Sequence, residues 1–190
     1  MHIQTPTEAL KAGMPPPRGL VLVRVAGVGR GSPARQKMRT TTLEIARCWL
    51  RDRSASQSIR LLETASGPRL VADSGEMPLE VSLSYDGVDG WVCFGNARAV
   101  GCDAVRIEMF PEMEAVGTLY LGSEMADRLM HATDPARAFA ESWSAWEASR
   151  KRRRLAMSEQ PKGSLPLESE ARLRDVEYLL FHDVVVAVSA

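Results

Sequence analysis

Two carboxylates and a lysine in the second half of this sequence could act together. Glu147 and Lys151 stand four residues apart in the run ESWSAWEASRKRRR, and this spacing would place them on one face of a helix. Asp103 interrupts the apolar run VGCDAVRI, where a buried carboxylate is costly unless it has a partner. An aspartate on a strand and a glutamate on a following helix can converge on one Mg²⁺ ion, which keeps several of its waters. A plainer interpretation also stays open: Glu147 is then a surface charge paired with Lys151, and Asp103 lies on an exposed face or at a strand end.

Three further groups of polar residues could meet an anion. The run SLSY ends a predicted strand with Ser84 and Tyr85, which could hold a phosphate or could be ordinary edge-strand residues. The run GPRL, which contains Arg69, predicts a turn. The cations from Arg150 to Arg154 suit a solvated helix end, where the helix dipole favours positive charge. A nucleic-acid patch is the alternative for these cations, although no aromatic residues interleave with them.

Composition and charge narrow the class of protein. The chain has 190 residues, which suits one large domain or two small similar halves, and its hydrophobic fraction of 45% suffices for a packed core. The formal net charge is zero, so bulk electrostatics predict no polyanionic partner such as a nucleic acid. The three cysteines lack metal-ligand spacing and lie in apolar segments, which predicts buried free thiols and a cytoplasmic location. We expect neither a signal peptide nor a membrane span, because no apolar run is long enough for either.

The first half of the chain predicts a strand, a helix and then further strands. Consecutive prolines close the segment 1–17, which we expect to be a flexible arm. The pattern then predicts a strand at 19–28, a helix at 34–53 and a strand at 58–64. Two alternating runs around DGVDG predict a hairpin over 79–96.

The second half repeats this order. A strand is predicted at 97–110, followed by two short helices split near Gly122 and by a longer helix at 135–153 that Asp134 would cap. After a loop at 159–169, a closing pair of strands turns near His182–Asp183. The pattern predicts an α+β fold of two similar α+β halves, 18–97 and 98–190, packed pseudo-symmetrically.

Four of these segments, taken in order, resemble motifs of the 4′-phosphopantetheinyl transferase superfamily. They are GPR at 67–69, VSLSYDGVDGWVCFG, VGCDAV and FAESWSAWEASRK. The larger, surfactin-type members carry a Gly-Lys-Pro-like turn, an SLSHS strand, a GxDxE strand and a WxxKEAxxK helix in this order. The resemblance spans about residues 35–151, and the closing strands also look like that family's ending.

The resemblance implies an activity. Members of this family transfer the 4′-phosphopantetheine arm of coenzyme A to a serine of an acyl- or peptidyl-carrier protein and release 3′,5′-ADP. The reaction needs Mg²⁺ on the pyrophosphate, because the leaving group gathers negative charge. The site lies between the two halves, and the two-halved form implies a monomer with no membrane partner.

The central roles carry over onto three residues. Asp103 matches the aspartate of GxDxE and would be the first Mg²⁺ ligand. Glu147 matches the glutamate of KEA and would be the second ligand, and it could also take part in removing the serine proton. Lys151 matches the last lysine of that helix, which would contact the coenzyme's phosphates and could protonate the leaving group.

Four coenzyme-binding roles follow in the same way. Ser84 matches the second serine of SLSH and would hold a coenzyme phosphate, and Tyr85 stands where histidine is usual. Arg69 would replace the lysine of the Gly-Lys-Pro turn in a different residue order. Arg39, on the first long helix, would match a phosphate-binding arginine.

This sequence departs from the family pattern at three places. Val105 stands at the position of the third family carboxylate, which the small trimeric holo-carrier-protein synthases also lack. Trp146 replaces the lysine of KEA. The sequence RRRL follows Lys151 where the family prefers GxGL. A degenerate, non-catalytic homologue that binds coenzyme A or a carrier protein is therefore the alternative. If the transferase reading holds, the cations from Arg150 to Arg154 would meet the coenzyme's phosphates or the acidic helix of the carrier protein.

Overall fold

The first sheet has two central strands that are buried on both faces. The structure, a computed structural model, describes residues 3–12, 19–50, 58–64, 67–73, 77, 79–96, 98–155 and 175–190. Its four-stranded sheet has the order β1-β2-β6-β5 and consists of β1 (Ile3–Gln4), β2 (Leu20–Val25), β5 (Leu79–Tyr85) and β6 (Gly90–Asn96). Val21 and Val23 face the core beneath helix α2 (Gly31–Leu50), whereas Leu22 between them faces a second sheet. Because successive side chains of β2 point to opposite faces of the sheet, this strand contributes to two hydrophobic layers.

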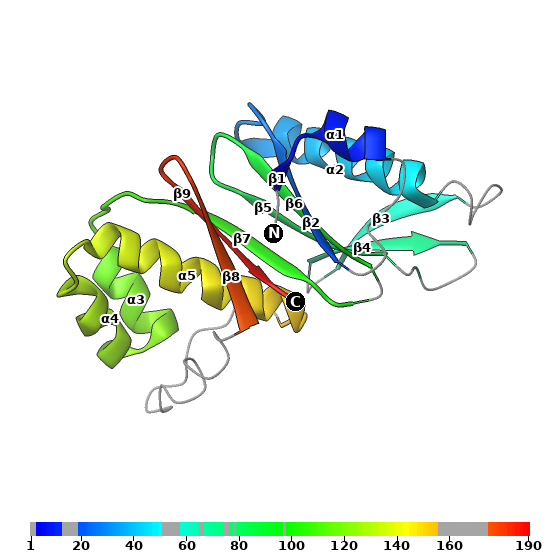
Figure 1. The fold of residues 1–190 in the computed structure, drawn as a ribbon. Helices are drawn as coiled ribbons and strands as arrows, with labels where there is room; N and C mark the ends of the chain where they lie inside the picture. The colour runs from blue at the N-terminus through cyan, green and yellow to red at the C-terminus, as the bar shows by residue number, and fades with distance from the viewer. Residues whose placement is uncertain are drawn as a thin grey trace.

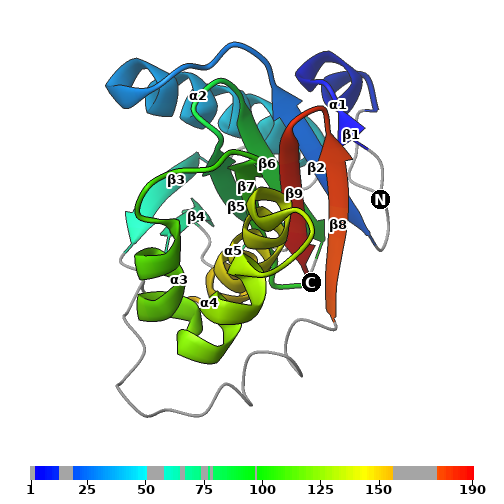
Figure 2. The same cartoon turned by 90° about the vertical axis from the view of Figure 1, so that its left-hand side faces the viewer.

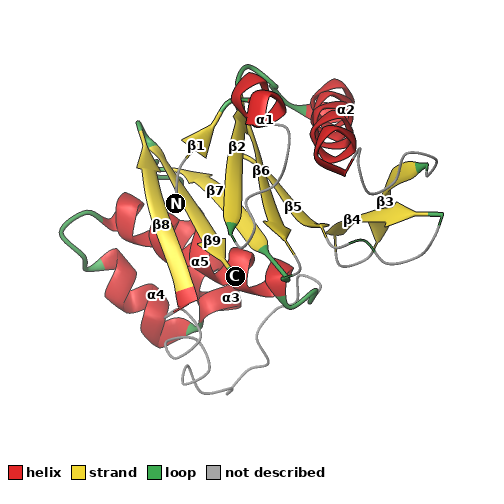
Figure 3. Cartoon of the chain, turned by 45° about the vertical axis from the view of Figure 1, so that its right-hand side comes forward, coloured by secondary structure: helices red, strands yellow, loops and turns green. Residues whose placement is uncertain are grey.

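The second sheet packs on the first and carries its own helix. It has the order β7-β9-β8, with the antiparallel strands β7 (Gly101–Arg106), β8 (Val176–Phe181) and β9 (Val184–Ser189). Val186 faces the first sheet, while its neighbour Ala187 packs against Ala145 and Ala148 of helix α5 (Pro135–Arg152). The molecule is thus layered as helix, sheet, sheet and helix (Figure 1; Figure 3).

The two sheets share one strand order. In the first, β2 pairs with β6 and β6 with β5; in the second, β7 pairs with β9 and β9 with β8. In each half the long helix follows the first of these strands and precedes the other two. The predicted α+β class is confirmed. The predicted division at 97–98 and the pseudo-symmetry of the halves agree with this order and stay predictions.

Smaller elements complete each half. The hairpin of β3 (Ile59–Thr64) and β4 (Gly67–Ala72) projects beside the first half. Helices α3 (Met113–Leu121) and α4 (Ser123–Met130) pack on α5 at the far end of the second half (Figure 2). None of the helices in the described ranges is long and apolar enough to cross a membrane.

Part of the expected N-terminal arm belongs to the first half. Residues Ile3–Gln4 form β1, which pairs with β2, and Pro6–Ala12 form helix α1. Ala9 is fully buried, and its carbonyl oxygen accepts a hydrogen bond of 2.7 Å from the indole of Trp49. These contacts correct the prediction of a flexible arm for residues 3–12, whereas residues 13–17 lie outside the described residues.

Some of the other local predictions are confirmed and others are wrong. The break at Gly122, the cap by Asp134 on the backbone nitrogen of Arg137, and the turn at His182 are confirmed. The GPRL segment, predicted as a turn, is instead the start of β4, because Gly67 to Leu70 pair with β3. The strand predicted at 97–110 is shorter, since β7 covers only Gly101–Arg106. The loop predicted at 159–169 lies outside the described residues.

Two serine hydroxyls join the sheets where β5 approaches β7. The Ser82 hydroxyl oxygen accepts a hydrogen bond of 2.9 Å from the backbone nitrogen of Cys102, and that of Ser84 accepts one of 3.1 Å from Ala104. Because Ser82 and Ser84 are two residues apart on a strand, both side chains point the same way. The SLS sequence thus supplies acceptors to backbone N–H groups of β7.

Helix α5 lies in backbone contact with β7. A Cβ atom at Gly101 would collide with the carbonyl oxygen of Ala148 and the backbone nitrogen of Arg152. Only glycine leaves room for this approach. The close packing brings the last turn of α5, including Lys151, over the middle of β7.

Candidate functional site

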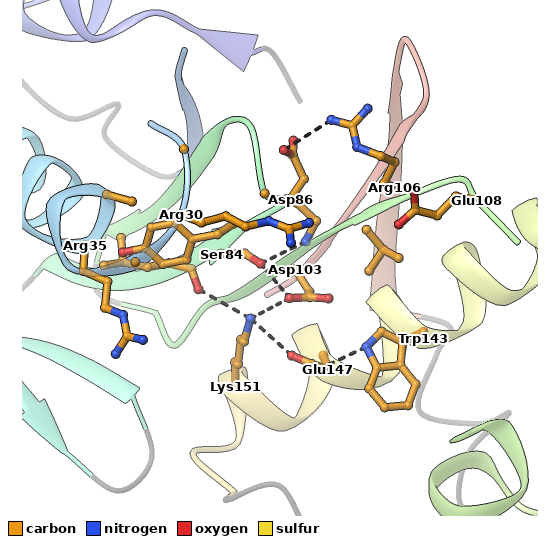
Figure 4. Close-up of a pocket in the computed structure, with 18 of the residues that line it drawn as sticks. Arg30, Arg35, Ser84, Asp86, Asp103, Arg106, Glu108, Trp143, Glu147 and Lys151 are labelled. Atoms are coloured by element: carbon orange, nitrogen blue, oxygen red, sulfur yellow. Dashed lines mark hydrogen bonds and ion pairs between the residues drawn. The ribbon is translucent and has the colours of Figure 1, made fainter. Parts of the chain in front are cut away.

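A cleft of about 580 Å³ lies where the two halves meet, a size common for small-molecule sites. Its wall comes from the start of α2, the end of β5 with the following turn, β7 with the segment after it, and one face of α5. Figure 4 shows side chains from these elements converging on one space. Its polar lining includes Arg30, Arg35, Ser84, Asp103, Glu147 and Lys151.

Asp103 is buried at the floor of the cleft. Its side chain is only 6% exposed, which overturns the interpretation of an exposed strand residue. Its Oδ1 atom accepts a hydrogen bond of 2.7 Å from the hydroxyl of Ser84 and lies 2.6 Å from the Nζ atom of Lys151. The carboxylate is thus held by a hydroxyl from one half and an ammonium from helix α5, which offsets the cost of its burial.

Glu147 reaches the same point from the preceding turn of α5. Its Oε1 atom accepts a hydrogen bond of 3.1 Å from the indole of Trp143, and its Oε2 atom lies 3.4 Å from Nζ of Lys151. Burial, and then the charge of Asp103, raise the pKa of Glu147 above its ordinary value, although Lys151 opposes both. A carboxyl group with a raised pKa is better suited to accept a proton.

Lys151 links the two carboxyl groups. Besides Asp103 and Glu147, its Nζ atom lies within hydrogen-bonding distance of the carbonyl oxygens of Cys102 (3.2 Å) and Leu83 (3.4 Å). Burial by itself would lower the pKa of Lys151, but Asp103 and Glu147 outweigh it and raise that pKa above its ordinary value. The side chain therefore stays positively charged at neutral pH.

Ser84 and Tyr85 lie at the cleft, as the sequence predicted, but Ser84 already has partners. Its hydroxyl donates to Asp103 and accepts from the backbone of Ala104, and the residue is 5% exposed. Its clearest role is therefore to position Asp103. Tyr85 lines the cleft, and burial raises the pKa of its phenol, so the phenol stays neutral at physiological pH.

Arg39 and Arg69 do not join this group. The guanidinium of Arg39 lies 2.5 Å from the carboxylate of Glu63 and donates to the carbonyl oxygen of Leu61 on β3. Arg69, on β4, lines a smaller hollow of about 60 Å³ that shares Lys151 with the main cleft. The structure thus places both arginines outside the main cleft.

Among the cations that line the cleft, Arg30 and Arg35 were not singled out from the sequence. Arg30 precedes helix α2, and Arg35 lies in its first turns, so both stand near the positive end of the helix dipole. Both residues are exposed, and neither makes an ion pair within the part of the chain that the structure describes. The signal in the sequence was the run GRGSPAR, in which Gly29 and Gly31 flank Arg30 at the start of α2. Basic side chains at a helix N-terminus are well placed for an anion.

Asp86, which lines the cleft, and Cys102, which is buried beside Asp103, have structural roles. Asp86 is 1% exposed, pairs with Arg106, and accepts hydrogen bonds from the backbone of Val88 and the indole of Trp91. These contacts fix the turn of the β5–β6 hairpin against β7. Burial raises the pKa of the Cys102 thiol to about 11, so this cysteine is not a nucleophile at neutral pH.

The donor atoms can be tested against the Mg²⁺ ion that the resemblance implies. Across the described ranges, no group of three or more His, Cys, Asp or Glu side chains is arranged to hold a metal ion. Val105, at the position of the third family carboxylate, lines the cleft with an apolar side chain. The ammonium of Lys151 stands between the remaining two carboxyl groups. As arranged, these residues do not fit the ion, and the Mg²⁺ requirement stays a prediction.

The sequence matches no protein-family model, and it matches no curated protein. The resemblance to 4′-phosphopantetheinyl transferases therefore rests on the four ordered motifs and stays a prediction.

Proposed function

We propose that this protein transfers the 4′-phosphopantetheine arm of coenzyme A to a serine of an acyl- or peptidyl-carrier protein, releasing 3′,5′-ADP. One observation carries the proposal. Ser84, Asp103 and the Glu147–Lys151 pair come from three of the four matched motifs and meet in one cleft between the halves. The resemblance implies a site at this place.

The cleft also has charge suited to the substrate. The bulk of coenzyme A's negative charge lies on its pyrophosphate and its ribose phosphate. Lys151 stands at the α5 side of the cleft, and Arg30 and Arg35 stand at the α2 side. Since the charge of Lys151 is largely matched by Asp103 and Glu147, we assign the main attraction for the phosphates to Arg30 and Arg35.

The chemistry needs a base and a stabilised leaving group. The oxygen of the carrier serine forms a bond to the phosphorus that bears pantetheine, and the bond from this phosphorus to the bridging oxygen of 3′,5′-ADP breaks. Glu147, with its raised pKa, takes the serine proton. Lys151 and the two arginines offset the negative charge that gathers on the departing 3′,5′-ADP.

The proposal includes a carrier-protein partner, which would contact fewer of the cations at the end of α5 than the sequence suggests. Arg154 lies 2.5 Å from the carboxylate of Glu80, and Arg152 lies 3.8 Å from that of Asp175, so both are engaged within the chain. Arg153 is exposed at the end of α5. We assign the attraction for an acidic carrier helix chiefly to Arg153. A monomer acting in the cytoplasm on this carrier also belongs to the proposal.

A binding protein without transferase activity is the second candidate. The observation that favours it is the third carboxylate position, where Val105 offers no oxygen, together with Trp146 in place of a family lysine. Trp146 is 8% exposed and packs with Trp143 and Tyr120, so it belongs to the core. Such a protein would hold coenzyme A or a carrier domain unchanged.

Intact-mass measurement separates the two candidates. The protein would be incubated with coenzyme A, Mg²⁺ and a panel of apo-carrier proteins. Transfer predicts that at least one carrier gains the mass of phosphopantetheine, and that Asp103→Asn and Glu147→Gln each reduce the rate by about a hundredfold or more. If no carrier gains mass while coenzyme A still binds, the transferase proposal fails and the binding proposal stands.

A further inference from the structure

We infer that the ammonium group of Lys151 is the resident cation of this site and occupies the place that the resemblance gives to Mg²⁺. The inference rests on the proposed function only for the identity of the anion that the cation would meet. It departs from the family expectation, because it makes coenzyme A binding independent of a divalent ion.

The surroundings of the Nζ atom carry the inference. Four oxygens surround it: Oδ1 of Asp103 at 2.6 Å, the carbonyl oxygens of Cys102 at 3.2 Å and Leu83 at 3.4 Å, and Oε2 of Glu147 at 3.4 Å. An ammonium has three N–H donors and no acceptor, so an all-oxygen shell suits it. A Mg²⁺ ion would demand near-octahedral oxygens at about 2.0–2.1 Å. Lys151 stands between the same two carboxyl groups that the ion would need (Figure 4).

The elements around Lys151 hold it in this place. Gly101 lets α5 touch β7, which shortens the distance that the lysine side chain must cover to reach Asp103. The hydroxyl of Ser84 donates to the same Oδ1 atom of Asp103 that Lys151 contacts, and the indole of Trp143 donates to the other oxygen of Glu147. Both carboxyl groups thus have a fixed partner in addition to the ammonium.

The third carboxylate position supports the same conclusion. Val105 lies two residues after Asp103 on β7 and also lines the cleft. An apolar side chain there removes the oxygen that would help a divalent ion to compete with Lys151. The ammonium of Lys151 cancels one of the charges of Asp103 and Glu147, which weakens the attraction of these two groups for such an ion.

Titration of the bare protein with Mn²⁺, followed by the relaxation of water protons, tests the inference without coenzyme A. Wild type is expected to show no saturable Mn²⁺ binding at millimolar concentration. Lys151→Met should bind Mn²⁺ at least tenfold more tightly than wild type, and adding Asp103→Asn to that variant should abolish this increase in affinity. Lys37→Met is the matched control, since Lys37 bonds to the carbonyl oxygens of Ala26 and Gly27 outside the cleft and should behave as wild type.

Two further measurements keep the test decisive if Lys151→Met does not fold. Lys151→Arg retains a cation and should exclude Mn²⁺ as wild type does. The affinity of wild type for coenzyme A should change less than twofold between excess Mg²⁺ and a chelator. Saturable Mn²⁺ binding by wild type, or coenzyme A binding that tightens tenfold with Mg²⁺, would overturn the inference. If coenzyme A does not bind at all, the proposed function fails, and the Mn²⁺ titration still decides the role of Lys151.

Discussion

Two carboxyl groups and one ammonium at the floor of the cleft depend on one another. Asp103 is the most buried of the three, and its strongest partner is Lys151 at 2.6 Å. Removing one member of a buried ion pair leaves the other charge without compensation, which costs more than the pair contributes. The group is therefore sensitive to single changes in both stability and function.

Lys151→Met tests this dependence. In this variant the Asp103 carboxylate would lose its ammonium partner while remaining buried. We therefore expect the free energy of unfolding at pH 7 to fall by about 2 kcal/mol or more. This value is smaller than for a fully buried pair, because the side chain of Lys151 is 29% exposed and solvent screens its charge. Urea denaturation measures the change. Lys37→Met should stay within about 0.5 kcal/mol of wild type. Equal stability of the two variants would show that the Asp103–Lys151 pair does not support the fold.

Glu147 predicts a dependence of stability on pH. Burial and Asp103 raise its pKa in the folded state, so above the ordinary value of 4.5 the folded chain holds more protons at this residue than the unfolded chain. Its contribution to stability is then present at lower pH and is lost as the pH rises through the folded pKa. Glu147→Gln should remove this loss, so the melting temperature of the variant relative to wild type should increase from pH 4.5 to pH 7. A constant difference over this range would contradict the raised pKa.

At the scale of the elements, the contact between α5 and β7 positions the site. It depends on Gly101, because any side chain there meets the backbone of α5. We expect Gly101→Ala to push the helix away, to lower the free energy of unfolding by about 1–3 kcal/mol, and to weaken coenzyme A binding by separating Lys151 from Asp103. Denaturation and calorimetry measure the two effects.

Gly117→Ala serves as the control for this substitution. Gly117 also lies in a close helix contact, where an added Cβ would come 3.2 Å from the Cβ of Ala126, but this contact is remote from Lys151. The control should leave coenzyme A binding unchanged. If Gly101→Ala also leaves binding unchanged, the approach of α5 to β7 does not set the geometry of the site.

Most elements could be predicted from local pattern, and there are physical reasons why α1 and β4 were not predicted. Thr5 and Glu8 form a capping box, in which each side chain bonds the other's backbone nitrogen, with Pro6 at the first helical position. This signal for α1 was present but was overshadowed by the prolines that follow. The glycine and proline of the GPRL segment predict a turn, yet the pairing of this segment with β3 decides its conformation. Such pairing is a tertiary effect that a short window does not contain.

For the molecule as a whole, the site was predictable only in part. Asp103, Glu147 and Lys151 could be grouped by motif order, and the structure brings them together. The competition between Lys151 and a metal ion could not be predicted, because it depends on distances between a strand and a helix. Arg30 and Arg35 were missed because their relevance comes from the packing of the two halves, which places the start of α2 opposite α5. For the same reason, the sequence did not show that Arg39, unlike Arg30 and Arg35, lies outside the cleft.

Charge reversal at the end of α5 tests the proposed carrier surface. Arg153→Glu should raise the KM for the carrier several-fold, reduce its dependence on salt, and leave kcat nearly unchanged, because an exposed charge acts mainly on encounter. Arg154→Glu should in addition lower stability, since it places two carboxylates together at Glu80. Steady-state kinetics at two salt concentrations provide the comparison. An unchanged KM in Arg153→Glu would return this residue to the solvated helix end that the sequence also allowed.

Calorimetric titration of the purified protein with coenzyme A tests whether the cleft between the halves binds this molecule. We expect saturable binding with one site per chain. We also expect a loss of affinity of about tenfold or more when Arg30 and Arg35 are both changed to Gln, because charge-assisted hydrogen bonds to phosphate would be lost. Arg60→Gln is the control, since this exposed arginine pairs with Asp73 away from the cleft and should bind as wild type does. Absence of binding, or equal affinity in all three proteins, would show that coenzyme A does not bind in this cleft.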